Sequence, residues 1–289
     1  MSPKPDAAKS FCDLLESESN KSTGLAAIET LHDVLNHCNA TTAAELENNL
    51  VSVVRAMEKT DYSSTSIRSA TDLFRRFISL APAELLDQAD FSQVLEFYRK
   101  RGINFIDRVS RSRALISKYA RPFFRNNMNI LTHSYSKVVL EAICDAHSAG
   151  ISIHVWVTES QPDASGRRMH ERLTSCGINS TLVLDSCVGY LMERIQMVLV
   201  GAEGVMETGG IINKIGTLNV AIFVKEYPLN QADIPQEFKY RTSVIENKDL
   251  ALEHPEVDYT PPQYINLLIT DLGILPPAAV GEELIKLYI

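Results

Sequence analysis

The sequence predicts an α/β fold in which a helical N-terminal domain, residues 1–127, precedes a domain built on a parallel sheet, residues 128–289. Up to about residue 127, apolar residues recur at three- and four-residue spacing, which is the period of a helix. From residue 128, short apolar runs alternate with amphipathic segments, which is the rhythm of β-then-α units. With 289 residues, 45% of them hydrophobic, the chain is long enough to bury a substantial core.

The helical domain carries several amphipathic stripes. In "TTAAELENNLVSVVRAME", Thr41 or Thr42 is placed to cap a helix, and Glu45 completes a capping box with Thr42. Similar stripes occupy residues 25–35, 73–78 and 91–119, and we interpret them as core faces. The hydroxyl-rich stretch between Asp61 and Ser69 is predicted to be a loop between two helices.

Four strand-then-helix units follow in the second domain. The strands are predicted at "NILTH", "ISIHVWV", "STLVL" and "MVLVG", and Gly150 is placed to end the first of the intervening helices. In the fourth unit a helix is expected to begin at the Asn-Lys pair of "INKIGTLNVAIFVKE". Units in series predict a parallel sheet with helices on both faces and a ligand crevice at the carboxyl ends of its strands.

Composition excludes several classes of function. A net charge of −8 argues against general affinity for nucleic acids or membrane surfaces. The five cysteines are scattered singly and the histidines are dispersed, so we expect reduced thiols and no metal site. The sequence has no apolar run of membrane-spanning length, and its first residues lack the order of a signal peptide. We therefore expect a cytosolic protein.

One segment departs from the acidic balance. Nine basic residues lie between Arg99 and Arg125, opposed only by Asp107. Two interpretations remain open, a solvated helix face and a face that reaches a phosphate or a partner. The candidate contacts in the second case are Arg101, Arg108, Arg111 and Arg113.

The loop "GAEGVMETGGIINKIGT", residues 201–217, has the composition of a phosphate site. Gly209 and Gly210 allow close backbone approach, the N–H groups at the start of the following helix suit an anionic oxygen, and Lys214 adds a charge. Asn213 either orients a ligand hydroxyl or caps the helix. The loop is not a Walker A motif, and no GxGxxG fingerprint follows the first strand, so nucleotide-binding interpretations are disfavoured and a small phosphorylated metabolite is favoured.

Candidate catalytic residues stand at the ends of other strands. Asp185 is the best-placed carboxylate, and His133 and Ser134 end the first strand. As neighbours at a strand end, His133 and Ser134 point in different directions and do not form a triad. Glu159, Asp163 and Glu203 are interpreted as helix caps or water-binding groups.

Five segments carry a resemblance to a known family. The sequences "ILTHSYSKVVLEA", "VWVTESQPDASGRRM", "GGIINKIGT", "YPLNQADIP" and "DYTPPQYINLLITDLGILPP" resemble the regulatory subunits of eukaryotic translation initiation factor 2B, and among them the alpha subunits. The wider family includes isomerases that act on methylthioribose 1-phosphate or ribose 1,5-bisphosphate. The resemblance implies a helical domain followed by a Rossmann-like domain, which agrees with the patterns above.

The positions at which this sequence differs from the isomerases imply an active site that has lost its catalytic residues. The resemblance places Ser134 where the isomerases carry a catalytic cysteine and Gly210 where they carry an acid, whereas Gly209, Gly210, Asn213 and Lys214 match the parts that hold phosphate. Proton transfer between sugar carbons needs a positioned acid and base, which glycine and serine do not supply. We therefore expect no catalysis and no cofactor, with a sugar phosphate as the ligand that the pocket still suits.

The resemblance also implies partners. The family's alpha subunits pair as homodimers, bridge two halves of a decamer with beta, gamma, delta and epsilon subunits, and sense translation initiation factor 2 whose alpha subunit is phosphorylated. The alternative functions are a sugar-phosphate isomerase and a nucleotide-dependent oxidoreductase. The second is disfavoured because the sequence lacks the glycine fingerprint of dinucleotide-binding domains. The apolar run around Leu268 either packs on the sheet or forms the subunit interface.

One strand that the family pattern contains is missing from this sequence. The family adds a strand of the type "PFYV" before "PLNQ", whereas here Lys225-Glu226-Tyr227 runs directly into "PLNQADIP". Either the strand is deleted or the sequence omits part of the natural chain. We favour the second interpretation, because a deleted internal strand exposes a central pairing edge.

Overall fold

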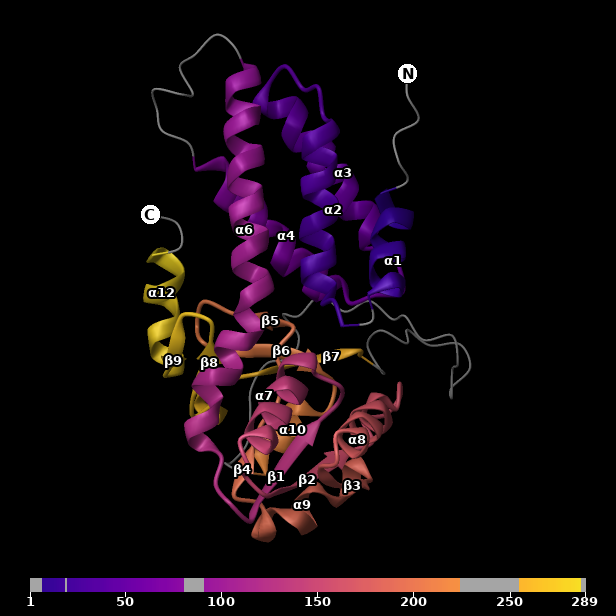
Figure 1. The fold of residues 1–289 in the computed structure, drawn as a ribbon, viewed down its shortest axis with the longest axis vertical. Coiled ribbons are helices and arrows are strands. Elements are labelled where there is room, and N and C mark those ends of the chain that lie inside the picture. The colour runs from indigo at the N-terminus through magenta and orange to yellow at the C-terminus, as the bar shows by residue number, and fades with distance from the viewer. Residues whose placement is uncertain (1–6, 19, 81–90, 224–254, 287–289) are drawn as a thin grey trace. The chain divides into compact units, whose positions relative to one another are not determined.

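The structure is a computed structural model that describes residues 7–18, 20–80, 91–223 and 255–286 (Figure 1). The chain divides into two compact units, residues 112–283 and the remainder on either side of them. The α/β fold class predicted from the sequence is confirmed. Among the described helices, none combines the length and the hydropathy that crossing a bilayer requires.

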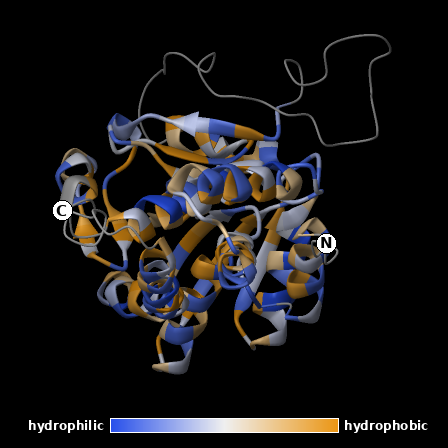
Figure 2. Ribbon diagram, turned by 90° about the horizontal axis from the view of Figure 1, so that it is seen from above, coloured by the Kyte–Doolittle hydropathy of each residue, from blue (hydrophilic) through white to orange (hydrophobic). Residues whose placement is uncertain are grey.

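The first unit is a bundle of helices around one apolar core. Its elements are α1 (Ala7–Ser17), α2 (Thr23–His37), α3 (Ala43–Met57), α4 (Ser64–Ser79) and the first two thirds of α6 (Phe91–Ala120). The helices mix hydrophobic and hydrophilic residues, as amphipathic helices do (Figure 2). Fully buried side chains from four helices meet in the core, among them Phe11, Leu31, Leu50, Met57 and Phe74.

Helix caps in this unit confirm one prediction and correct another. Thr42 caps α3, with its hydroxyl accepting the N–H of Glu45. The loop predicted between Asp61 and Ser69 is wrong for its last six residues, because α4 begins at Ser64. Ser63 caps that helix by accepting the N–H of Ser66, so part of the hydroxyl-rich stretch is a helix start rather than a connection.

A parallel four-stranded sheet forms the centre of the second unit. The strands are β1 (Met128–His133), β2 (Ile153–Thr158), β3 (Asn179–Val183) and β4 (Met197–Val198), in the order β3-β2-β1-β4. Ile130, Val155 and Val157 pack with α7 (Lys137–Ser148) and α8 (Ser165–Ser175). Leu131 packs on the other face with α9 (Val188–Leu191) and α10 (Thr217–Ile222). Gly150, with φ 85°, follows the end of α7 as expected.

A second, antiparallel sheet and a hairpin complete this unit. The sheet is β5 (Gly204–Val205), β6 (Ile211–Lys214) and β7 (Val257–Thr260), and the hairpin is β8 (Leu268–Thr270) and β9 (Gly273–Leu275), followed by α12 (Val280–Lys286). Short 3₁₀ turns lie at Arg121–Phe123, Asp185–Cys187, Met192–Arg194, Pro262–Tyr264 and Pro277–Ala279. The stretch after Lys225 and the "PLNQADIP" segment lie outside the described residues.

The predicted helix start at the Asn-Lys pair is wrong. Asn213 and Lys214 are the last residues of β6, where they pair with Asp258 and Val257 of β7. The helix α10 begins only at Thr217, after Gly216 with φ 101°. The β-pairing partner is 40 residues or more away in sequence, which a local pattern does not reveal.

Candidate functional site

The candidate site lies where the strand order of the parallel sheet reverses. β1 is central, with β2 and then β3 on one side and β4 on the other, so the strand order reverses between β1 and β4. Their carboxyl ends approach closely, because a Cβ built on Gly201, after β4, would meet the Ser136 hydroxyl at 2.6 Å. Such a reversal point is where ligands bind in open α/β sheets.

His133, the last residue of β1, is buried and fully hydrogen-bonded. Its Nε2 lies 2.7 Å from the Ile215 carbonyl oxygen and its Nδ1 lies 2.7 Å from the Thr158 hydroxyl. Because a carbonyl only accepts, Nε2 carries the proton and Nδ1 accepts. Burial lowers the pKa of His133, against the opposing effects of the Ile215 hydrogen bond and of Asp185 and Asp163. His133 is therefore a neutral side chain with no nitrogen free for proton transfer.

Ser134 and Asp185 are also engaged by neighbouring loops. Ser134 has φ 66°, and its N–H donates to the Ser160 hydroxyl at 2.6 Å. Its own hydroxyl lies 2.8 Å from that of Ser165, not against the His133 ring, so the two neighbours do point apart. Asp185 accepts the N–H groups of Ser160 and Gln161, each at 2.8 Å. The hydroxyls and the carboxylate thus cross-link the ends of β1, β2 and β3.

The expected phosphate site at the start of α10 already holds an anionic group of the chain. The Asp258 carboxylate accepts the N–H of Gly216 at 2.7 Å and that of Leu218 at 3.1 Å. Burial raises the pKa of Asp258 to about 7, against these two hydrogen bonds, which lower it. Asn213 donates to the Thr217 hydroxyl at 3.0 Å, so it braces the helix start. The N-terminus of α10 is therefore not open to a ligand oxygen in this structure.

The other predicted phosphate-holding groups also face the chain itself. Lys214 Nζ lies 3.0 Å from a Glu256 carboxylate oxygen and 3.4 Å from one of Asp163. A Cβ built on Gly209, with φ 83°, would lie 2.2 Å from the Pro277 carbonyl oxygen. A Cβ on Gly210 would lie 2.3 Å from the Tyr259 hydroxyl. The structure thus brings Asp163 and Lys214 near His133, whereas Gly209 and Gly210 face Pro277 and Tyr259.

A cluster of three cations lies at the starts of α7 and α8, and of its members the sequence indicated Arg113 but not Lys137 or Arg168. Lys137 is the first residue of α7, and Arg113 and Arg168 both act on its charge. Burial above all, and then repulsion by Arg113 and Arg168, lower the pKa of Lys137 to about 8. The Arg168 guanidinium stacks 4.4 Å from the Tyr135 ring centre, and Arg113 Nε lies 3.7 Å from Glu141.

This cluster is arranged as an anion site. A lysine at a helix N-terminus opposes the helix dipole, and two further cations increase that cost. An anion bound there would relieve both effects, as phosphates do at helix starts. The sequence signal that could have indicated Lys137 is "YSK". It places a lysine in the first turn of a helix that begins at the carboxyl end of a strand.

The remaining candidate arginines belong to the first unit and differ in role. Arg101 donates to the Phe77 carbonyl oxygen at 2.9 Å, and its guanidinium stacks 4.2 Å from the Phe77 ring centre, so it braces α4 against α6. Arg111 forms an ion pair with Asp107, one turn earlier on α6. Arg108 is exposed on the same helix. Of these three, Arg108 and Arg111 are exposed, and Arg111 is paired with Asp107.

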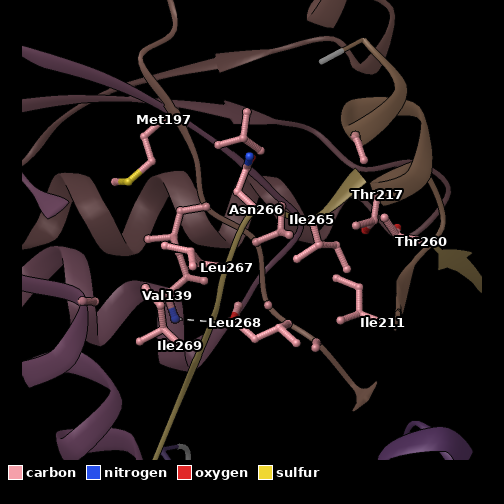
Figure 3. Close-up of a pocket in the computed structure, with 18 of the residues that line it drawn as sticks. Val139, Met197, Ile211, Thr217, Thr260, Ile265, Asn266, Leu267, Leu268 and Ile269 are labelled. Atoms are coloured by element: carbon pink, nitrogen blue, oxygen red, sulfur yellow. Dashed lines mark hydrogen bonds between the residues drawn. The ribbon is translucent and has the colours of Figure 1, made fainter. Parts of the chain in front are cut away.

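An apolar cavity of about 700 Å³ opens beside β4 (Figure 3). Its walls include Met197 of β4, Val139 of α7 and Leu268 of β8, with Ser136 and Gly201 at the end nearest the strand reversal. Thr217 and Thr260 supply hydroxyls on the side away from Val139 (Figure 3). Within the described residues, no three His, Cys, Asp or Glu side chains are grouped to hold a metal ion.

Comparison with known proteins assigns the family. A model of the initiation factor 2 subunit family matches residues 16–277. The chain belongs to this family. The resemblance inferred from the sequence motifs is thereby confirmed. In this family, the chain is 65% identical over 297 residues to the Caenorhabditis elegans translation initiation factor eIF2B subunit alpha, with 97% of both chains covered.

Two further relatives are less similar to this chain. The eIF2B subunit alpha of Dictyostelium discoideum is 36% identical, over 96% of this chain and 95% of its own length. The ribose 1,5-bisphosphate isomerase of Archaeoglobus fulgidus is 31% identical, over 62% of this chain and 63% of its own length.

Solved structures of the family share the fold. A Pyrococcus horikoshii translation initiation factor eIF-2B aligns with a TM-score of 0.72 at 21% identity, covering 95% of this chain and 98% of that one. A chain of the tetrameric eIF2B-beta2-delta2 complex from C. thermophilum aligns with a TM-score of 0.71 at 14% identity, covering 97% and 94%. At these identities the likeness bears on the fold alone.

Proposed function

We propose that the chain is a non-catalytic regulatory subunit, the alpha subunit, of the factor that exchanges guanine nucleotide on translation initiation factor 2. The observation that carries this proposal is the 65% identity to the C. elegans eIF2B subunit alpha across nearly the whole of both chains. As such a subunit it forms a homodimer that bridges two halves of the complete factor in the cytosol. It senses the substrate whose alpha subunit is phosphorylated.

Purification from the native cytoplasm tests this assignment. We expect the tagged chain to be recovered with four larger partner chains, each with two copies per particle. Exchange activity of the reconstituted factor should then be inhibited by phosphorylated substrate only when this chain is present. Recovery of the chain with itself alone, or equal inhibition in its absence, would contradict the proposal.

Exposed cations on α6 are the candidate contacts to the phosphorylated substrate. A phosphoserine carries about 1.5 to 2 negative charges and is best met by arginines. Arg108 and Arg111 are exposed, so their reversal to Glu should weaken inhibition while the first unit stays folded. Arg101→Glu is the contrasting variant, because that side chain is stacked on Phe77 and its reversal should unfold the bundle. Full inhibition of the R108E/R111E factor would refute this role.

We further propose that the second unit retains a pocket for a sugar phosphate. The cation cluster of Arg113, Lys137 and Arg168 includes the first residue of α7, which follows the strand reversal at the end of β1. The hydroxyls of Ser134 and Ser165, 2.8 Å apart, join the same end of β1 to the start of α8. A ligand that binds only the folded chain stabilises it by mass action. Ribose 5-phosphate should therefore raise the melting temperature in a concentration-dependent way, and ribose should not. Equal responses to the two would exclude phosphate recognition.

The alternative of an isomerase is addressed by the same residues. The 31% identity to a ribose 1,5-bisphosphate isomerase gives this alternative its basis. Against it, the His133 ring has both nitrogens engaged, and the Ser134 hydroxyl contacts Ser165 rather than a base. We expect no turnover of ribose 1,5-bisphosphate or methylthioribose 1-phosphate. Product formation that scales with the concentration of purified chain would establish the isomerase instead.

A further inference from the structure

The apolar cavity beside β4 lies where the parallel sheet ends and the helices that cover it continue. In the described chain, β4 is an edge strand of this sheet and has only two residues. Val139 of α7 and Val220 of α10, which pack on opposite faces of the sheet, both line the cavity, and so does Leu268 of β8. The cavity of about 700 Å³ therefore continues the apolar interior of the second unit beyond the edge of the sheet.

The walls of this cavity suit a neutral molecule. Most of the described residues that line it are aliphatic or aromatic, none of them is basic, and Asp271 is the acidic one. A charged group that moves from water into apolar surroundings loses its hydration without compensation. An anionic ligand is thereby disfavoured, which separates this cavity in its chemistry from the proposed sugar-phosphate pocket.

One polar group in the wall has no partner among the described residues. The Thr260 side chain on β7 lines the cavity and is 1% exposed, and its hydroxyl makes no hydrogen bond to the described chain. Thr217, on the same side of the cavity (Figure 3), is different. Its hydroxyl donates to the Lys214 carbonyl oxygen at 2.7 Å and accepts from Asn213 Nδ2 at 3.0 Å. Because an unpaired buried hydroxyl is costly, a ligand that pairs with Thr260 gains affinity there.

We propose that this cavity binds a neutral, largely apolar small molecule that carries one hydroxyl group. The apolar body of the ligand lies between α7, β4 and residues 265–269, and its hydroxyl forms a hydrogen bond with the Thr260 side chain. Ligand sites of this volume accommodate drug-sized molecules and combine apolar walls with a few placed polar groups. A hydroxyl is the complement of Thr260, because each of the two groups both donates and accepts.

A matched pair of probes tests the proposal on the full chain. 4-Butylphenol and butylbenzene have the same apolar body and differ by one hydroxyl group. Ligand-observed NMR titrations at about pH 7, where the phenol is neutral, give the dissociation constant of each probe. We expect 4-butylphenol to bind about five-fold more tightly than butylbenzene, which is the effect of one neutral hydrogen bond. Equal affinities for the two probes, or no saturable binding of 4-butylphenol, would overturn the proposal.

Two threonine variants locate the hydrogen bond. Thr260→Val replaces the hydroxyl by a methyl group, and we expect it to lower the affinity for 4-butylphenol to that for butylbenzene. Thr132→Val is the matched control, because the Thr132 hydroxyl on β1 is also buried and unpaired within the described chain but is not part of the cavity wall. Each variant removes an unsatisfied hydroxyl and should keep the fold. An unchanged preference for the phenol in Thr260→Val, or its loss in Thr132→Val, would contradict the proposed contact.

Filling the cavity tests where the apolar body lies. Val139 is part of the cavity wall (Figure 3), and Val139→Phe places a ring in the space that the ligand needs. We expect this variant to bind neither probe, and saturating ribose 5-phosphate to leave the binding of 4-butylphenol to the wild type unchanged. A folded Val139→Phe that binds both probes normally, or displacement of 4-butylphenol by ribose 5-phosphate, would show that the probes bind elsewhere. If Val139→Phe does not fold, the comparison of Thr260→Val with Thr132→Val decides alone.

Discussion

At the scale of single residues, Lys137 is a cation held in surroundings that disfavour its charge. Its charge is opposed by burial, by Arg113 and by Arg168, which lower its pKa from an ordinary value of 10.5 to about 8. Lys137→Met should therefore raise the urea midpoint at pH 7 and abolish the stabilisation by ribose 5-phosphate. This gain in stability should be constant below pH 8, where the lysine is charged in both the folded and the unfolded chain. It should vanish as the pH rises towards 10.5, because the lysine is then neutral in the unfolded chain as well.

Lys118→Met is the matched control for this experiment. Lys118 is exposed on α6, so its substitution should leave both the urea midpoint and the response to ribose 5-phosphate nearly unchanged. If Lys137→Met kept the full response to the ligand, the cation cluster would not be the phosphate site.

Asp258 is a buried carboxylate that holds a helix start. Its contribution to stability has the opposite pH dependence to that of Lys137, because it gains its charge as the pH rises. Its pKa rises from an ordinary 3.8 to about 7, so the folded chain binds more protons than the unfolded chain between these values. Stability should therefore fall as the pH rises from about 4 to about 7, by on the order of 4 kcal/mol from this group. Asn accepts the same N–H groups without charge. Asp258→Asn should lose that component of the pH dependence.

His133 acts in the same pH range with the opposite sign. Its lowered pKa means that acid protonates the unfolded chain more readily, so stability rises with pH up to about 6.5. Because both wild type and Asp258→Asn contain His133, the difference between their pH profiles from urea unfolding isolates the aspartate. The exposed Asp61→Asn serves as control. Identical profiles for wild type and Asp258→Asn would show that the carboxylate is ionised at no cost.

At the scale of elements, the seating of α8 on the end of β2 depends on a glycine. A Cβ built on Gly166 would lie 1.8 Å from the Thr158 carbonyl oxygen, which is backbone that cannot rotate away. Gly166→Ala should destabilise the chain by about 3 kcal/mol or more. Gly150→Ala has open space around its Cβ and is strained only by its φ of 85°, so it should cost about 1 kcal/mol. Equal losses in thermal unfolding would contradict this account of the packing.

Local sequence patterns predicted the elements whose signals are local. Thr42 with Glu45 marked a helix start, and Gly150 marked a helix end, because caps and left-handed positions depend on a few adjacent residues. Asn213 was misplaced on a helix because its strand partner, Asp258, lies far along the chain. The same distance hid the fact that Asp258 occupies the helix start where a phosphate was expected.

The candidate site was predictable in location but not in chemistry. Alternating strands and helices predict a ligand crevice at the carboxyl ends of the strands. The residues at those ends include His133, Ser134 and Asp185. Their hydrogen bonds to Thr158, Ser160 and Ser165 come from other loops and depend on the tertiary structure. Arg113 was a candidate contact, but its grouping with Lys137 and Arg168 was not predictable for the same reason, since α6, α7 and α8 each contribute one member of the cation cluster.

At the scale of the whole molecule, the hairpin of β8 and β9 and the residue before it are one of the places in the described chain where apolar side chains are left in solvent. Leu267, Leu272 and Ile274 are 43%, 39% and 39% exposed, whereas Leu268 is 9% exposed. Leu267 and Leu268 both line the apolar cavity, but only Leu268 is buried there. Leu268 therefore serves the fold of its own chain, and its substitution would not separate assembly from folding. Leu267 is the residue on which a test of the proposed homodimer should rest.

Leu267→Asp should dissociate a homodimer that uses this hairpin while the chain stays folded. A carboxylate placed in an apolar subunit interface loses its hydration without gaining a partner, whereas at an exposed position of a monomer it stays in water. Sedimentation equilibrium should give a dimer for the wild type and a monomer for Leu267→Asp, with unchanged circular dichroism. Leu184→Asp is the matched control, since Leu184 is 55% exposed after β3, and it should remain dimeric. A Leu267→Asp variant that remains dimeric would show that the interface lies elsewhere. An unpaired charge at the apolar centre of a buried interface of moderate size causes a large loss of affinity.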